Sequence, residues 1–335
     1  MTHTHPTPPV VEANSATEGP CKSCSATTSV PLQLVPSPPS TKEVHALPKA
    51  DILVVTWTEA ETSALALVFG GGLYNFNSLT NNNFTPLKIA GLPLPTDSNH
   101  PTSHGAFFTV KVNGKSVVCL QSNFHPKFDT AGTTLFFEKI VGSAASPNYL
   151  VTSGTSGGIW PNIDVGDVIV TNAARYGLSF PAEKQKLTPY SGTSNVLGTN
   201  PPSGYATWYD YVSKTIIQAD TCVLAGLSST GGRANTSKPA IYYKPSGTDP
   251  TDVVTDTRIS QECANINTYR TMGASLDEND AFVAEACQAV GFQNWISIRN
   301  ISDLPCSPNK NQYDRFQYCS SINGAYAVWA FVMGH

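Results

Sequence analysis

The stretch that most constrains the fold spans residues 149–172 and reads YLVTSGTSGGIWPNIDVGDVIVTN. It predicts a buried strand at 149–151, a turn through the glycines of 154–158, and a second apolar strand at 168–170. Small residues let a ligand approach the backbone, and loops at the carboxyl ends of buried strands are where open α/β sheets bind ligands. A plain connection between a strand and a turn is the alternative interpretation of the same glycines.

Strands and helices alternate along the rest of the chain. Apolar runs predict further strands, Asn113-Gly114 predicts a type I′ hairpin turn between two of them, and helical spacing predicts several helices. The predicted strands are 52–55, 106–112, 116–121, 253–256 and 295–301, and the predicted helices are 59–69, 130–141, 209–225, 280–291 and 322–333. Residues 73–105 are predicted to be loop. This alternation indicates an α/β fold, which we expect to be a three-layer α/β/α sandwich with a central mixed sheet.

Composition divides the chain into an extension and one folded domain. Residues 1–47 are rich in Pro, Ser and Thr and cannot bury enough apolar surface to offset their chain entropy, so we predict a disordered N-terminal extension. The domain then covers 48–335, with a long insertion at about 173–250. An insertion of this kind in an α/β domain is either a substrate lid or oligomer contact, or a passive segment.

Charge and hydropathy exclude several classes of protein. Charged residues make up 13% of the chain and the formal net charge is −4, which leaves no basic surface for nucleic acid. No apolar run reaches the roughly 18 residues of a membrane span, and the first residues lack the basic and apolar regions of a secretory signal. We therefore expect neither nucleic acid nor a membrane as a partner, and a cytoplasmic location.

The chain has 8 cysteines. Because it is long and carries no export signal, most of them are predicted to be buried thiols in a reducing compartment. Cys21-Lys22-Ser23-Cys24 forms a CxxC, a pattern that can mark a zinc site or a redox pair. It lies in the Pro/Ser/Thr-rich extension, with no strand before it and no second CxxC. We interpret it as a flexible pair that oxidises opportunistically.

Three motifs at strand ends occur in the order of a known family. They are the acidic end of the first strand, Thr56-Trp57-Thr58-Glu59-Ala60-Glu61, the glycine-rich stretch of 154–158, and Ser302-Asp303 at the end of a late strand. Together they resemble the nucleoside phosphorylase/nucleosidase superfamily, which includes purine nucleoside phosphorylases and methylthioadenosine/S-adenosylhomocysteine nucleosidases. The resemblance covers about 50–172 and 250–303. It implies cleavage of the N-glycosidic bond of a small-molecule purine nucleoside, without a cofactor or a metal.

This reaction passes through an oxocarbenium-like cation, so it needs an acid at the leaving base and a nucleophile at the opposite face of the sugar. The resemblance makes Asp303 the acid, supported by Ser302, at the end of an apolar strand where partial burial raises a carboxyl pKa. It makes Glu61 the base that orients the attacking water, whereas Glu59 points elsewhere. The alternatives are that Asp303 only caps a turn and that both glutamates only favour a helix N-terminus.

The sugar clamp departs from the family pattern. Counting back from Asp303 without gaps places Asp280 on the family glutamate that holds the sugar hydroxyls, and Asn279 on the methionine before it. A carboxylate accepts two hydroxyl hydrogen bonds, but that of Asp280 reaches one methylene less far. A slip of one residue puts Asn279 there instead, and Glu278 is also close.

A second departure concerns the base. Asp256 and Arg258 fall where the family has an aspartate and then an aromatic residue that packs on the base. The guanidinium of Arg258 can stack on a base or bind a phosphate. A surface position is the alternative for an isolated arginine.

The anion site separates hydrolases from phosphorylases in this family. Phosphorylases place an arginine two residues before the glycine of the central loop, where this chain has Thr152. They also often carry a Gly-Asp-Pro loop after the first strand, where this chain has Thr-Trp-Thr at 56–58. A phosphate dianion needs several charge-assisted donors, and Lys127 and Arg175 are the contributors to consider. We therefore predict water as the nucleophile, which makes the protein a nucleosidase.

With water as nucleophile, we predict that Thr155 and Gly157 line the sugar and water side and that Thr58 is a further substrate contact. Two other functions stay open. One is a phosphate-dependent purine nucleoside phosphorylase whose phosphate ligands come from a neighbouring subunit, and the other is a non-catalytic nucleoside-binding or storage-type protein of the same fold. The resemblance also implies a homo-oligomer (a dimer, trimer or hexamer), because family members commonly share sites between subunits.

Overall fold

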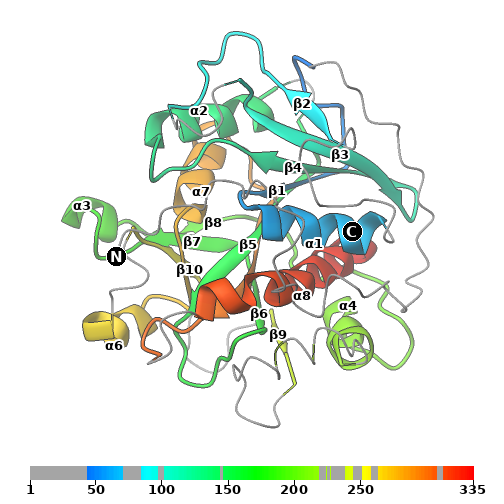
Figure 1. The fold of residues 1–335 in the computed structure, drawn as a ribbon, viewed down its shortest axis with the longest axis vertical. Coiled ribbons are helices and arrows are strands. Elements are labelled where there is room, and N and C mark those ends of the chain that lie inside the picture. The colour runs from blue at the N-terminus through cyan, green and yellow to red at the C-terminus, as the bar shows by residue number, and fades with distance from the viewer. Residues whose placement is uncertain are drawn as a thin grey trace, which may run out of the picture.

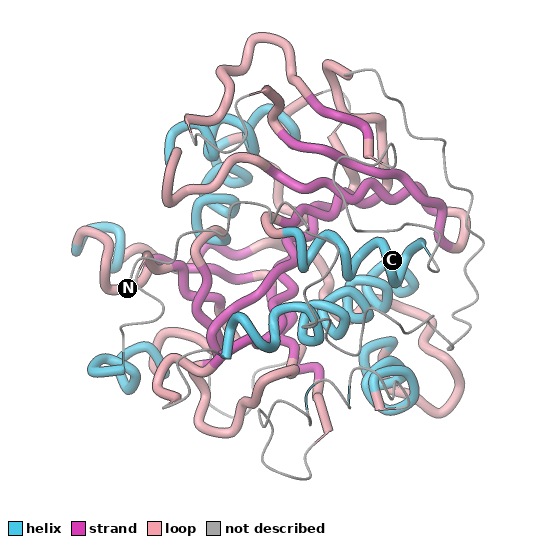
Figure 2. The backbone as a smooth tube through the Cα atoms, viewed as in Figure 1, coloured by secondary structure: helices cyan, strands magenta, loops and turns pink. Residues whose placement is uncertain are grey.

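A mixed sheet lies between two layers of helices in the computed structural model, as the sequence predicts (Figures 1 and 2). The structure describes residues 44–70, 84–96, 102–143, 146–218, 224, 227, 238–243, 251–257, 263–307 and 312–335. Most of the predicted extension, with Cys21 and Cys24, lies outside these residues, and so does Arg258.

The central strand is β5 (Tyr149–Gly158). Along one edge it pairs in parallel with β12 (Trp295–Asp303), from Leu150 to Gly157. Its other edge is shared by β1 (Ile52–Thr56), which is parallel to it, and β11 (Ser275–Asp277), which is antiparallel and lies beside Gly157 and Gly158. The carboxyl ends of β1 and β11 therefore face each other beside the middle of β5, and the links that follow them meet there.

The sheet extends away from β5 along several strands. Beyond β1 it continues through β4 (Lys115–Ser122), β3 (Gly105–Val112) and β2 (Thr85–Leu87). Beyond β11 it continues through β10 (Val253–Thr255), β7 (Ala173–Tyr176) and β8 (Tyr190–Ser191). β12 also pairs with β6 (Val168–Thr171), which pairs with β9 (Ile241–Tyr242). The predicted hairpin turn is confirmed, since Asn113 and Gly114 between β3 and β4 have φ of 50° and 81°.

Helices cover both faces of the sheet. On one face α1 (Glu59–Gly70) packs beside α8 (Gln312–Gly334), and on the other α2 (Thr130–Val141) packs against α7 (Asp280–Ala289). The shorter helices are α3 (Ala182–Gln185), α4 (Trp208–Tyr211), η2 (Val212–Ile217), a π-helix that continues α4, and α6 (Ile266–Arg270). Among the described helices, none is both long and apolar enough to span a bilayer.

The glycine-rich stretch differs most from its prediction. It was expected to form a turn at 154–158, but it continues β5 to Gly158, and none of its three glycines has a positive φ. The turn prediction was wrong because β12 and β11 supply hydrogen-bond partners on both edges up to Gly157. Instead, the small residues let neighbouring side chains come close to the backbone of β5. A Cβ at Gly154 would lie 2.7 Å from Nη1 of Arg299 and 2.8 Å from Oε1 of Glu61.

Some other elements also differ from the prediction. The last helix begins at Gln312, ten residues earlier than expected, and β2 lies in a segment predicted to be loop. Three strands of the segment at 173–250, namely β7, β8 and β9, belong to the main sheet. Among the described cysteines, Cys119, Cys287 and Cys319 are buried free thiols as predicted. The thiol prediction is wrong for Cys263 and Cys306, which lie on exposed loops and form a disulfide.

Candidate active site

Glu61 is held by five hydrogen bonds at the carboxyl end of β1, four of them to its carboxylate. Its Oε2 accepts from the backbone N–H groups of Trp57 at 3.0 Å and Thr58 at 2.9 Å. The N–H of Glu61 donates to the Thr58 hydroxyl at 3.3 Å, which completes a capping box at the start of α1. Its Oε1 accepts from the N–H of Thr155 at 2.8 Å and from its hydroxyl at 2.9 Å. One oxygen thus stabilises the helix N-terminus, while the other reaches β5.

Arg299 occupies the middle of β12 and is only 1% exposed. Its guanidinium donates to both carboxylate oxygens of Asp280, with Nε 2.8 Å from Oδ2, and pairs with Oδ2 of Asp277 at 2.8 Å. Its Cζ lies 5.2 Å from the ring centroid of Trp57. Burial by itself lowers the pKa of Arg299, but the neighbouring carboxylates outweigh that effect and raise it. The sequence analysis missed this residue, although a lone arginine within an apolar strand signals a buried ion pair.

Asp280, a predicted sugar contact, is 1% exposed and bound on both oxygens. Besides Arg299, it accepts a hydrogen bond from the hydroxyl of Ser297. Its neighbour Asp277 accepts from the Thr255 hydroxyl at 2.6 Å and from the N–H of Asp280 at 2.7 Å. The pKa of Asp277 is raised to about 7, mainly by burial and also by the negative charge of Asp280, while Arg299 opposes both. These groups join α7 to β10, β11 and β12.

Glu278 lies in the link between β11 and α7 and keeps 21% of its side chain exposed. Its Oε1 is 3.2 Å from Nζ of Lys127, and its Oε2 is 3.5 Å from Nε2 of His125. The N–H of Lys127 donates to Nδ1 of His125 at 3.2 Å, so the neutral imidazole carries its proton on Nε2, toward Glu278. Beside Glu278, Asn279 is 6% exposed, and its Oδ1 has no hydrogen-bond partner among the described residues.

Asp303 ends β12 next to Gly157 of β5 and is half-buried. The hydroxyl of Ser302 donates to its Oδ1 at 2.8 Å. Tyr313, in the first turn of α8, was not singled out from the sequence. Burial raises its pKa, and the negative charges of Glu61, Asp303 and Glu278 raise it further, while a side-chain hydrogen bond with Thr155 lowers it. The Tyr313 hydroxyl therefore stays protonated, and its pKa responds to the charge of all three carboxylates.

The fold brings most of the predicted site residues to the carboxyl ends of β1 and β12. These are Thr58, Glu61, Thr155, Gly157, Ser302 and Asp303. Asp256 is fully buried elsewhere, where it accepts hydrogen bonds from the Tyr269 hydroxyl at 2.6 Å and the Ser179 N–H at 3.0 Å. Arg175 pairs with Asp252 at 2.8 Å. The resulting site has two separately held carboxyl groups, Glu61 after β1 and Asp303 at the end of β12, and both strands pair with β5.

Comparison with known proteins gives a consistent family. The sequence profile of the phosphorylase superfamily matches residues 88–327. A 5′-methylthioadenosine/S-adenosylhomocysteine nucleosidase of Pseudoalteromonas translucida is 24% identical over 232 residues, which cover 68% of this chain and 83% of that protein. The corresponding nucleosidase of Actinobacillus succinogenes is 30% identical over 88 residues, 26% of this chain and 36% of that protein.

Solved structures share the fold at low sequence identity. The nucleosidase of Colwellia psychrerythraea in complex with adenine has a TM-score of 0.53 and 14% identity, covering 86% of this chain and 97% of that one. The futalosine hydrolase of Helicobacter pylori has a TM-score of 0.51 and 12% identity, covering 85% of this chain and 98% of that one. These similarities establish the α/β architecture.

Proposed function

The chain belongs to the phosphorylase superfamily, and we propose that it is a nucleosidase that cleaves the N-glycosidic bond of a purine nucleoside with water as the nucleophile. One observation carries this proposal. Two carboxyl groups are held beside β5: Glu61, after β1, by bonds from Thr155, and Asp303, at the end of β12, beside Gly157 and bonded by Ser302. Hydrolysis of a glycosidic bond requires such a pair, one to orient water and one to supply a proton. The similarity to nucleosidases, one of them solved with adenine, supports the purine assignment.

In this proposal Asp303 donates a proton to the purine as the bond to the sugar breaks. Ser302 holds one oxygen of Asp303 and so fixes which way the carboxyl group faces. Glu61 accepts a proton from the attacking water and orients it toward the sugar carbon. Because four donors fix the carboxylate of Glu61, its position is set before substrate arrives, which lowers the reorganisation needed in the transition state.

For the sugar hydroxyls we propose Glu278 and Asn279 as acceptors. Asp280 was the first candidate from the sequence, but both of its oxygens bind Arg299. One oxygen of Glu278 pairs with Lys127 and the other lies beside His125, and a carboxylate offers about four acceptor positions, so two remain for hydroxyl donors. The Oδ1 of Asn279 is a buried acceptor whose desolvation a donor from substrate would offset.

Water is favoured over phosphate because the two cations weighed as phosphate ligands are already paired. Lys127 pairs with Glu278 at 3.2 Å, and Arg175 pairs with Asp252 at 2.8 Å. A phosphate dianion would have to displace a carboxylate from each of them and would then lie close to it. This arrangement supports hydrolysis.

Product analysis tests the proposal directly. Purified protein is incubated with adenosine, inosine, guanosine, methylthioadenosine, AMP and uridine, with and without phosphate, and the products are separated by chromatography. We expect free purine and free sugar, without a phosphate requirement. Sugar 1-phosphate formed only with phosphate would instead indicate a phosphorylase. Nucleoside binding without release of any base would indicate a binding protein.

A further inference from the structure

The disulfide between Cys263 and Cys306 lies at the surface of the molecule. Both residues are exposed, and their Cα atoms are 4.9 Å apart. The other described cysteines, Cys119, Cys287 and Cys319, are buried free thiols. Burial raises the pKa of Cys119 and Cys287 further, which makes their thiolates scarce. In the described part of the chain, thiol chemistry is therefore concentrated at the exposed pair.

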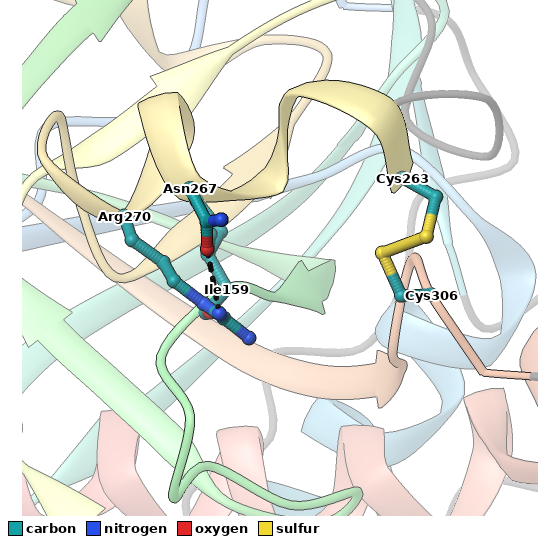
Figure 3. The surroundings of a disulfide bond; sticks show 5 residues. All are labelled: Ile159, Cys263, Asn267, Arg270 and Cys306. Carbon is teal, nitrogen blue, oxygen red and sulfur yellow. Dashed lines mark hydrogen bonds between the residues drawn. A yellow bond between two sulfur atoms is a disulfide. The ribbon is translucent and has the colours of Figure 1, made fainter.

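One end of this disulfide belongs to a firmly anchored segment. Cys263 lies three residues before α6, whose Tyr269 is fully buried and donates to Asp256 at 2.6 Å. Arg270 of the same helix donates from Nε to the carbonyl oxygen of Ile159 at 2.9 Å, and from Nη1 to Asn267 at 3.0 Å (Figure 3). Because Ile159 directly follows β5, the helix is fixed to the end of the central strand.

The other end belongs to the short loop after the candidate acid. Cys306 follows Asp303 by three residues, and the loop between them leaves the sheet where β12 ends. The N–H of Leu304 donates to Oε1 of Gln312 at 2.9 Å, and the N–H of Ser307 donates to Leu304 at 2.9 Å. The disulfide is the covalent tie in this loop. It joins the loop that follows Asp303 to the segment before α6 (Figure 3), and α6 is in turn bonded to Ile159 at the end of β5.

We propose that the Cys263–Cys306 disulfide is a reducible clamp that holds Asp303 in position, so that thiol–disulfide exchange at this pair controls the activity. The proposal rests on the proposed function, in which Asp303 is the acid. Exposed disulfides are the labile ones in proteins. A dithiol reductant attacks one sulfur and forms a mixed disulfide, and its second thiolate then closes a ring. Two electrons and two protons leave the reductant and yield two cysteine thiols, while the reductant becomes a disulfide.

Reduction should affect one chemical step more than the others. A purine leaves only when it is protonated, so its departure depends on the placement of Asp303. A nitrophenolate leaves without a proton, and its departure depends on the sugar and water side of the site alone. Misplacement of a catalytic group by about 1 Å can cost about 100-fold in rate. We therefore expect reduction to lower kcat/KM for purine nucleosides by about 10- to 100-fold, with little change for a nitrophenyl riboside.

The experiment compares the oxidised and the reduced full chain. Dithiothreitol reduces the protein, mass spectrometry of peptides locates the thiols formed, and kcat/KM is measured for adenosine and for 4-nitrophenyl β-riboside. The Cys263→Ser/Cys306→Ser variant should behave like the reduced protein and should not respond to dithiothreitol. A Cys21→Ser/Cys24→Ser variant is the control, and it should respond as the unmodified chain does.

Several results would overturn the clamp. They are failure of dithiothreitol to open the pair, unchanged adenosine cleavage after full reduction, and an equal fall for both substrates. If the oxidised protein cleaves no nucleoside at all, the proposed function is wrong, and hydrogen exchange then tests the clamp by itself. Faster exchange in the peptide over 301–307 on reduction would support it. Unchanged exchange there would contradict it.

Discussion

Glu61 and Thr155 are 94 residues apart in the chain, yet Oε1 of Glu61 accepts both the N–H and the hydroxyl of Thr155, at 2.8 and 2.9 Å. The other oxygen of Glu61 closes the capping box of α1. The capping interpretation of this residue is therefore confirmed, and its role as the base of the site stays a prediction. The capping bonds hold Oε2 and so fix the direction in which Oε1 faces Thr155.

Replacing Glu61 by glutamine should lower kcat by about 100-fold or more, because an amide cannot accept the proton of the attacking water. The amide also places an NH₂ group against two of the four donors that now hold the carboxylate. Steady-state kinetics and calorimetric binding of adenosine measure the effect, and Glu59→Gln in the same helical turn is the control. Loss of binding with unchanged kcat would make Glu61 a ligand contact.

The Asp303→Asn variant should lose about 100- to 10,000-fold in kcat for purine nucleosides, since an amide has no acidic proton to give. The hydrogen bond from Ser302 can be kept by the amide oxygen, so the thermal unfolding midpoint should change little. Steady-state rates with adenosine measure the loss of kcat, and a thermal melt measures the unfolding midpoint. Turnover at the normal rate in a folded Asp303→Asn protein would rule out its role as the acid.

Adding one methyl group at Gly154 should disable the site. The new Cβ would lie 2.7 Å from Nη1 of Arg299 and 2.8 Å from Oε1 of Glu61, so one of these charged groups must move. Gly158→Ala on the same strand is the matched control, because its Cβ would meet the apolar atom Cγ2 of Ile163 at 2.6 Å. We expect Gly154→Ala to lower kcat by more than about tenfold. Gly158→Ala should mainly lower the unfolding midpoint, and equal activity losses would argue against a special role for Gly154.

Glu278→Gln should weaken nucleoside binding, whereas Asp280→Asn should lower the stability of the fold. Each variant is compared with the unmodified protein by calorimetric binding of adenosine and of 2′,3′-dideoxyadenosine, which lacks the 2′ and 3′ hydroxyls of the sugar. If Glu278 accepts those hydroxyls, Glu278→Gln should weaken adenosine binding by about 10-fold and leave the dideoxy compound unaffected. Asp280→Asn should lower stability instead, by about 3–5 kcal/mol, because it leaves Arg299 partly unpaired. The reverse pattern would return the sugar contact to Asp280.

Stability should fall as pH rises through the titration of Asp277. Burial raises its pKa to about 7 in the fold, against an ordinary value of 3.8. Between these values the folded protein holds a proton that the unfolded chain has released, so the free energy of unfolding falls with a slope of up to about 1.4 kcal/mol per pH unit. The contribution is complete below about pH 4 and is lost above about pH 7. Urea unfolding of the natural chain and of Asp277→Asn over this range should differ by that slope, and identical pH dependence would contradict the assignment.

The sequence predicted those parts of the fold that local patterns determine. The Asn-Gly hairpin and the helix at 130–141 are confirmed, because turn chemistry and apolar spacing are properties of neighbouring residues. The glycines of 154–158 were mistaken for a turn, because the partners that hold them in a strand come from β11 and β12, more than 100 residues later. Backbone pairing at that distance leaves no local mark in the sequence.

The candidate site, too, has some features that local sequence patterns predict and others that they do not. The acids at strand ends were found because a polar residue after an apolar run is a local signal, as at Glu61 and Asp303. The occupation of Asp280 by Arg299 was missed, since it depends on how a helix N-terminus packs against a neighbouring strand. The exposed disulfide could not be derived either. Cysteine count and spacing do not determine pairing, and Cys263 and Cys306 are 43 residues apart in the sequence.

β5 sets the distances between the groups that attach to it. Glu61 bonds to Thr155 of that strand, whereas Asp303 and Leu276 of β11 both pair with Gly157, so their separations follow roughly the 3.3 Å rise between residues and the 4.8 Å spacing between strands. Segments attached elsewhere can change in length during evolution, and so alter which substrates enter, without changing those separations. Inserting one residue between Thr155 and Gly157 would change the separation of Glu61 from both Asp303 and β11. We expect divergence among related chains to spare the length of this strand above all.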